Sequence, residues 1–176
     1  MAYPFQSPAA GRKDIPASPG KLWKRIPQER RLQASAAFWQ DERDSLEQQA
    51  EALLAVASHF RFRAKTVRTL PLEKKVRYLA TLPGLPDSVA GHVLVAYHLA
   101  HQRPMLGAFL DGLGVAHENG VLKAEELKAP EAERLKTAAA TLCAAHPKED
   151  VDLYFQTLLV QDAETWGGLA DFIEQA

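Results

Sequence analysis

The sequence predicts one compact all-α domain over residues 21–176, an array of about seven or eight helices preceded by an extended N-terminal arm over residues 1–20. Apolar side chains recur with the 3.6-residue period of a helix in most segments. No segment alternates like a strand, and Val121–Leu122 is too short to count as one. Prolines, which favour the first turn of a helix, open several of these segments, at Pro71, Pro86, Pro104, Pro130 and Pro147.

Composition restricts the class of protein. Hydrophobic residues make up 47% and charged residues 24% of the 176-residue chain, which is typical of a globular domain. A chain of this length builds a core without disulfides or metal, and its one cysteine, Cys143, excludes an internal disulfide. No stretch approaches the roughly 18 apolar residues of a membrane span, and the first 20 residues contain no apolar run of signal-peptide length. We therefore expect a cytoplasmic protein without a membrane partner.

Residues 21–70 predict a helical hairpin followed by a basic connector. The hairpin comprises residues 28–40 and 45–60, and residues 61–70 carry four cations without a helical apolar stripe. The second helix is the clearest amphipathic segment, because its apolar residues fall on one side of a helical wheel. This predicted buried stripe contains Leu46, Ala50, Leu53, Leu54, Ala57 and Phe60.

The rest of the chain predicts two three-helix units, at residues 71–116 and 130–175. In the first unit the middle helix, residues 86–102, is apolar nearly all round, which predicts a central position. A turn and a short helical piece at 123–128 join the units, and Asp162 is expected to cap the last helix. The other helices are expected at residues 72–82, 104–112, 131–145 and 148–161.

The two units share a layout that indicates an internal repeat. A shift of about 60 residues aligns 75–80 with 134–139, and 109–113 with 169–173. A true duplication would pack the two apolar middle helices together. Amphipathic helices also resemble one another by chance, and two units are too few for a solenoid.

Charge is unevenly distributed along the chain. Residues 1–77 contain 15 Lys/Arg and 8 Asp/Glu, a net +7, whereas residues 78–176 contain 6 and 14, a net −8. The two halves can compensate each other within one molecule, attract another copy, or attract separate partners. A homo-oligomer is one expected consequence.

The basic stretch 61–77 is the leading candidate for binding a macromolecule. It holds seven cations against one acid, Glu73, with Phe60, Phe62 and Tyr78 in or beside it. Cations bind phosphates and aromatic rings stack on bases, but a pI near 6.6 is low for a nucleic-acid-binding protein. The candidate binding residues are Arg61, Arg63, Lys65, Arg68, Lys74, Lys75 and Arg77.

A second basic cluster surrounds Trp23, which we expect to be exposed. This cluster consists of Lys21, Lys24, Arg25, Arg30 and Arg31. An exposed tryptophan among cations favours association with a partner.

Three histidines are weak candidates for a metal site. His98 and His101 lie one helical turn apart, and either His92 or His117 would supply a third ligand. Neither the HExxH pattern nor the Glu-x-x-His pair of di-iron bundles is present. His98 and His101 fall on the least apolar side of their helix, so we expect them at the surface or at an inter-helix boundary.

Other residue patterns do not amount to a catalytic or cofactor motif. Asp111, His117 and Glu118 beside a glycine-rich helix end would serve acid–base chemistry, or would simply close the turn. Cys143 lies one turn from His146, but the C-terminal end of a helix disfavours a thiolate, so a small buried cysteine is expected. Gly112–Gly114 lacks the third glycine and the preceding strand of a dinucleotide site, and no cofactor is expected.

These patterns favour a non-catalytic helical protein that binds another macromolecule, with protein preferred. The first alternative is nucleic-acid binding through residues 61–77. The second is a metal-dependent or acid–base enzyme that uses the histidines.

Overall fold

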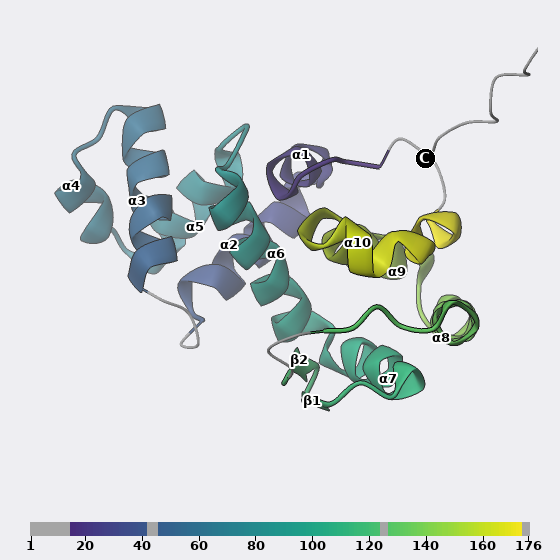
Figure 1. Cartoon of the computed structure of the whole chain (residues 1–176). Helices are drawn as coiled ribbons and strands as arrows, with labels where there is room; N and C mark the ends of the chain where they lie inside the picture. The colour runs from purple at the N-terminus through teal and green to yellow at the C-terminus, as the bar shows by residue number, and fades with distance from the viewer. Residues whose placement is uncertain (1–14, 42–45, 124–126, 174–176) are drawn as a thin grey trace, which may run out of the picture.

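The computed structural model describes residues 15–41, 46–123 and 127–173, and this part of the chain is nearly all helical (Figure 1). It contains ten α-helices, one 3-10 helix and a two-stranded hairpin, which confirms the all-α prediction. The count exceeds seven or eight because three helices are short: α1 (Pro19–Arg25), α4 (Ala64–Arg68) and α10 (Ala163–Trp166).

The longer helices follow the predicted order. None of their described ends departs from the expected position by more than about two residues, the usual uncertainty of a helix end. They are α2 (Gln28–Trp39), α3 (Leu46–Phe60), α5 (Leu72–Thr81), α6 (Asp87–His101), α7 (Arg103–Leu113), α8 (Ala132–Ala145) and α9 (Lys148–Gln161). The predicted last helix is instead α10 followed by the 3-10 helix η1 (Gly167–Phe172).

Local sequence signals account for several of these ends. Asp162 caps α10 as predicted, because its side chain accepts a hydrogen bond from the Thr165 N–H at 3.0 Å. Ser18 caps α1 in the same way through the Lys21 N–H. At the other end of a helix, Gly114 adopts φ 68° after α7, the left-handed conformation in which glycine is favoured.

Four expectations about local structure need correction. The arm predicted to reach residue 20 ends earlier, because α1 begins at Pro19, and its first 14 residues lie outside the described part of the chain. The connector 61–70 contains α4. Strands do form, at β1 (His117–Glu118) and β2 (Val121–Leu122), because Asn119 and Gly120 both take the positive φ of a tight hairpin turn. The predicted piece at 123–128 is not helical where described, and 124–126 lie outside that range.

Helix α6 joins two apolar clusters. Its buried residues from Val89 to Tyr97 pack with α1–α5, and we call this part the N-terminal lobe. Leu99 packs with α7, α8, α9, α10 and η1, the C-terminal lobe. Figure 1 shows α6 running between the two groups of helices. The predicted central position of α6 is therefore confirmed.

None of the described helices is long and apolar enough to cross a membrane.

The two middle helices of the predicted repeat lie against each other. His98 on α6 and Thr157 on α9 approach to 2.9 Å between Nε2 and Oγ1. This contact is the one that the repeat requires. The duplication itself stays a prediction, because the third helix of the second unit is replaced by a single α-turn and a 3-10 helix.

Trp23 is buried, so its predicted exposure is wrong. Its side chain is 0% exposed, and the indole N–H donates to the Leu82 carbonyl oxygen at 3.1 Å. The guanidinium of Arg31 lies 5.3 Å from the ring centroid. Because α1 packs on α6, the tryptophan on its inner face is part of the core rather than an anchor for a partner.

Replacing Trp23 with Phe should lower the free energy of unfolding by about 1–3 kcal/mol, because the Leu82 carbonyl loses its buried donor. Urea denaturation monitored by circular dichroism would measure the change. Lys21→Ala, an exposed change on the same helix, should stay within about 0.5 kcal/mol of the wild type. Equal stability of Trp23→Phe and the wild type would contradict this assignment.

Candidate macromolecule-binding surface

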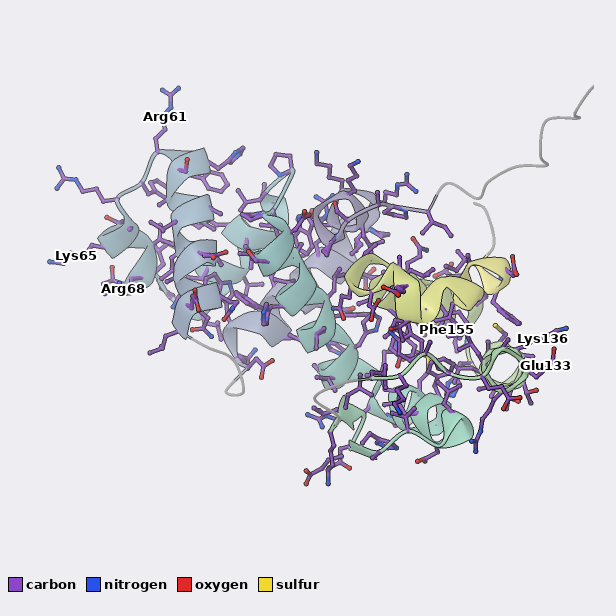
Figure 2. The ribbon with its side chains drawn as sticks, in the orientation of Figure 1. Arg61, Lys65, Arg68, Glu133, Lys136 and Phe155 are labelled. Atoms are coloured by element: carbon purple, nitrogen blue, oxygen red, sulfur yellow. The ribbon has the colours of Figure 1, made fainter. Side chains whose placement is uncertain are left out.

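The predicted basic residues gather around the end of α3, α4 and the start of α5. Arg61, Lys65 and Arg68 point away from the body at one end of the molecule (Figure 2). Arg63 and Lys74 are also exposed. Within the described residues, none of these five cations has an ion pair or a side-chain hydrogen bond. Their charges therefore face solvent without compensation from neighbouring acids.

The other two predicted binding residues already have intramolecular partners. Lys75 places Nζ 5.5 Å from the centroid of the Trp39 ring. Arg77 pairs with Glu73 one turn earlier on α5, at 2.8 Å. The predicted set of seven is thus divided into five unpaired cations and two that stabilise their own surroundings.

The aromatic residues of the basic stretch pack on one another. Phe60 lies 4.8 Å from Tyr78 and 5.9 Å from Phe62, measured between ring centroids, and Phe62 lies 5.4 Å from Tyr78. Phe62 is 37% exposed. Because the rings occupy one another's faces and edges, they do not stand free as stacking platforms for bases.

Helix α3 buries part of the predicted stripe, because Ala57 is buried and Leu53 and Phe60 pack partly buried against the core. Its buried residues are Ala52, Val56 and Ala57, whereas Leu46 is 87% and Leu54 59% exposed. Residues 52–57 are all apolar, so helical spacing alone does not decide which side faces the core. The predicted stripe is therefore confirmed at Leu53, Ala57 and Phe60 and wrong at Leu46, Ala50 and Leu54, which are exposed.

Exposed apolar side chains are concentrated in the same region. In the described ranges, five large hydrophobic residues are exposed, and four of them lie on α3, α5 or the turn after α3. Single exposed leucines are ordinary, but a group beside unpaired cations is typical of an interaction site. We define the α3–α5 surface as Leu46, Leu54, Arg61, Phe62, Arg63, Lys65, Arg68, Leu72 and Lys74.

Arg61 adopts the left-handed backbone conformation with φ 56°. It follows the last residue of α3, and the Phe62 N–H donates to the Ala57 carbonyl at 2.9 Å, as in a Schellman helix end. Glycine is preferred there, since a side chain costs about 1–2 kcal/mol in this conformation. The turn nevertheless holds an arginine, whose side chain points into solvent.

The second predicted basic cluster contains cations with structural roles. Arg30 on α2 pairs with Asp150 at 3.0 Å and with Glu149 at 3.4 Å, both in the first turn of α9. Arg31 donates to the carbonyl oxygens of Trp23 and Lys24. Part of the charge asymmetry is thus compensated inside the molecule, between the two lobes.

His98 is buried at the contact between α6 and α9, so its predicted inter-helix position is confirmed and the surface alternative is wrong. Thr157 donates its hydroxyl hydrogen to the Leu153 carbonyl, so His98 Nε2 must donate to the Thr157 oxygen. Nδ1 then remains an acceptor without a partner. Burial first, and the positive charge of Arg30 second, lower the pKa of His98 from 6.5 to about 3.

His117 closes the hairpin. Its Nε2 lies 2.7 Å from Asp111 Oδ1, and its Nδ1 accepts a hydrogen bond from the Gly120 N–H at 3.1 Å. Both ring nitrogens are therefore engaged, with Nε2 as the donor to the carboxylate. Of the two interpretations of Asp111 and His117, the geometry supports closure of the turn.

The three weak metal candidates do not come together. His101 is exposed with its ring 5.2 Å from that of Tyr97, whereas His98 and His117 have the separate partners described above. In the three described ranges, no group of three or more His, Cys, Asp or Glu side chains is placed to hold a metal ion. Cys143, predicted buried, is half-buried and not a disulfide partner.

A shallow groove lies between α2 and α6, with a volume of about 640 Å³. Alanines and Leu99 form its apolar part, and Gln33, Gln40, His101 and Arg103 add polar groups. The His101 ring lies beside that of Tyr97, and Arg103 donates to the Asn119 carbonyl oxygen. Because these polar side chains already have neighbours, the groove offers less to a ligand than the α3–α5 surface does.

The buried neutral His98 should make stability depend on pH. Its folded-state pKa lies below the ordinary 6.5, so the unfolded chain binds more protons between about pH 3 and 6.5 and stability falls as pH falls. Relative to His98→Gln, the free energy of unfolding of the wild type should fall by about 1.4 kcal/mol for each pH unit below 6.5. Denaturation at pH 7.5, 6, 5 and 4.5 would measure this. His101→Gln is the exposed control, and a pH-independent difference between wild type and His98→Gln would contradict the assignment.

Comparisons with known proteins add no relative. A scan against protein-family models, a search of curated proteins and a search of solved structures found no match to this chain. A functional conclusion must therefore rest on the geometry and charge of the chain itself.

Proposed function

We propose that this chain is a non-catalytic binding protein that uses the α3–α5 surface to associate with an acidic protein segment bearing apolar side chains. The observation that carries the proposal is the juxtaposition of exposed leucines with five unpaired cations. Leu46 and Leu54 are 87% and 59% exposed, and the region also exposes Leu72 and Phe62. An interface that covered these side chains would gain about 25 cal/mol for each Å² of apolar area removed from water.

A protein partner accounts for this surface better than a nucleic acid does. Phosphates would satisfy the cations but would leave the leucines in water. The rings of Phe60, Phe62 and Tyr78 pack on one another, which leaves little free ring face for bases. The whole chain carries a net charge of −1, so its long-range field does not favour a polyanion.

The conformation of Arg61 also supports a binding role. A glycine would relieve the left-handed backbone at this position, so an arginine there sacrifices stability. Residues kept in costly conformations are concentrated at functional sites. A solvent-facing cation beside Phe62 is of direct use only to a partner.

Arg61→Gly should therefore raise the free energy of unfolding by about 1 kcal/mol, because the backbone strain at this turn disappears. Thermal and urea denaturation would measure the gain, and Arg63→Gly, in extended backbone, should give none. A stability equal to or below that of the wild type would show that the Arg61 side chain supports the fold.

Two groups of substitutions separate a protein partner from a nucleic acid. The charge variant is Arg63→Glu/Lys65→Glu/Arg68→Glu, and the leucine variant is Leu54→Ser/Leu72→Ser. The tagged wild type should capture a protein from extract of its native cells that both variants lose, because the interface needs cations and apolar area together. The control, Lys128→Glu/Lys136→Glu, changes exposed cations of the C-terminal lobe, where Figure 2 places Lys136 at the opposite end.

The outcomes of this experiment differ in kind. Captured material that nuclease removes, and that only the charge variant loses, would replace the proposal with nucleic-acid binding. Identical captured material from the wild type, both surface variants and the control would show that the α3–α5 surface binds nothing.

A further inference from the structure

Thr66 on α4 lies among the unpaired cations of the α3–α5 surface. Four of these five cations stand within five residues of it in the chain: Arg61, Arg63, Lys65 and Arg68. Resting on the proposed function, we infer that Thr66 is the phosphate acceptor for a serine/threonine protein kinase that selects arginine-rich segments. The phosphate then closes the α3–α5 surface to an acidic partner.

The arginines before Thr66 have the spacing that an arginine-selective kinase requires. Arg63 is three residues and Arg61 five residues before the hydroxyl. Kinases of this class hold such side chains on acidic groups beside the active site, through charge-assisted hydrogen bonds. Both arginines are exposed and unpaired in the described structure, and Figure 2 shows Arg61 pointing away from the body. A kinase therefore binds them without breaking an intramolecular ion pair.

The Thr66 hydroxyl is exposed and free to react. Within the ranges that the structure describes, it makes no hydrogen bond. The Thr69 hydroxyl, by contrast, lies 3.0 Å from the Thr66 carbonyl oxygen and 3.3 Å from that of Lys65. Ser58 also exposes a hydroxyl that has no partner in these ranges, but no arginine stands within the five residues before it. Thr66 thus combines a free hydroxyl with the arginines that a kinase selects.

A second threonine has an arginine at the same distance, and its surroundings argue against modification. Arg134 lies three residues before Thr137, so spacing alone does not separate this residue from Thr66. The Thr137 hydroxyl donates to the Glu133 carbonyl oxygen at 2.9 Å, inside the 14-residue helix α8. Its neighbours Leu135 and Ala138 are buried in the C-terminal lobe. Presenting Thr137 to a kinase would therefore unfold part of a core.

Helix α4 opens at little cost, so a kinase cleft can take up the segment around Thr66. The helix has five residues, and Val67 is its buried side chain. A helix this short depends on packing rather than on its own hydrogen bonds. Segments with few buried apolar contacts open locally at low free energy. Thr66 therefore reaches an active site while the rest of the N-terminal lobe stays folded.

The reaction transfers the terminal phosphoryl group of ATP to Thr66. The Oγ1 atom attacks the γ-phosphorus, so that a new O–P bond forms while the bond from that phosphorus to the β–γ bridging oxygen breaks. ADP leaves with the electron pair, and the hydroxyl proton passes to the catalytic aspartate of the kinase. The chain thereby exchanges a neutral hydroxyl for a group with a charge of about −1.5 to −2 at neutral pH.

The phosphate acts on the α3–α5 surface in two ways. It forms charge-assisted hydrogen bonds with the neighbouring arginines, which are then no longer available to a partner. It also repels acidic side chains that approach α4. The same cations therefore recruit the kinase and are neutralised by its product.

Incubation of the full chain with ATP and the catalytic domain of protein kinase B, an arginine-selective kinase, tests the site. Mass spectrometry should place phosphate on Thr66, and Thr66→Val should abolish the incorporation. Arg63→Ala should slow it at least about tenfold, because the kinase loses a charge-assisted contact. Lys136→Ala, an exposed change on α8, is the control and should react like the wild type. No incorporation, or equal incorporation into the wild type and Thr66→Val, would overturn the inference.

Fluorescence anisotropy tests whether the phosphate closes the surface. The probe is a labelled random copolymer of glutamate and leucine, which carries the acidic and apolar groups of the proposed partner. Phosphorylation should raise its dissociation constant at least about tenfold, because the phosphate cancels much of the local positive charge. Thr66→Val taken through the same incubation should bind the copolymer like the unmodified wild type, and circular dichroism would check that its fold is unchanged.

This inference and the proposed function fail in different ways. A wild type that binds the copolymer but takes up no phosphate at Thr66, or that binds equally well once phosphorylated, would overturn the inference and leave the proposed function standing. An unmodified chain that does not bind the copolymer, although Thr66 is phosphorylated, would overturn the proposed function and with it the closing of the surface.

Discussion

The structure depends on enclosing α6, which is apolar on nearly every side. A helix of this kind is stable only when other elements cover its whole circumference. Its first three turns are covered by helices of the N-terminal lobe and its end by the C-terminal lobe, so one helix belongs to both apolar clusters. Helices α1, α2, α3, α7 and α9 contact α6 directly, and the remaining helices pack on these.

Polar contacts then join the elements around this helix. The His98–Thr157 hydrogen bond connects α6 to α9, and Arg30 pairs with Asp150 across α2 and α9. Trp23 connects α1 to the turn before α6 through the Leu82 carbonyl. Two of these residues, His98 and Trp23, are predicted from the sequence as a metal ligand and as part of a binding surface. Their burial explains why they serve the fold instead, since a buried polar group needs its partner.

Helix α3 packs on α6 through the buried Ala52, Val56 and Ala57, and Leu53 and Phe60 pack partly buried beside them. Leu46 and Leu54 on the same helix point outward. The chain then reverses at Arg61 into the short basic helix α4. The same packing that encloses the core thus leaves leucines and unpaired cations on one surface, which is the basis of the proposed binding function.

The sequence by itself determined the features that depend on near neighbours in the chain: the all-α class, the cap at Asp162 and the central position of an all-apolar α6. It also located the cations at residues 61–77. Only the tertiary structure decided which face of α3 is buried, because several rotations of an apolar helix satisfy the same spacing. It likewise decided the burial of Trp23 and His98, whose partners lie 59 residues away in the chain, a separation that local periodicity does not report.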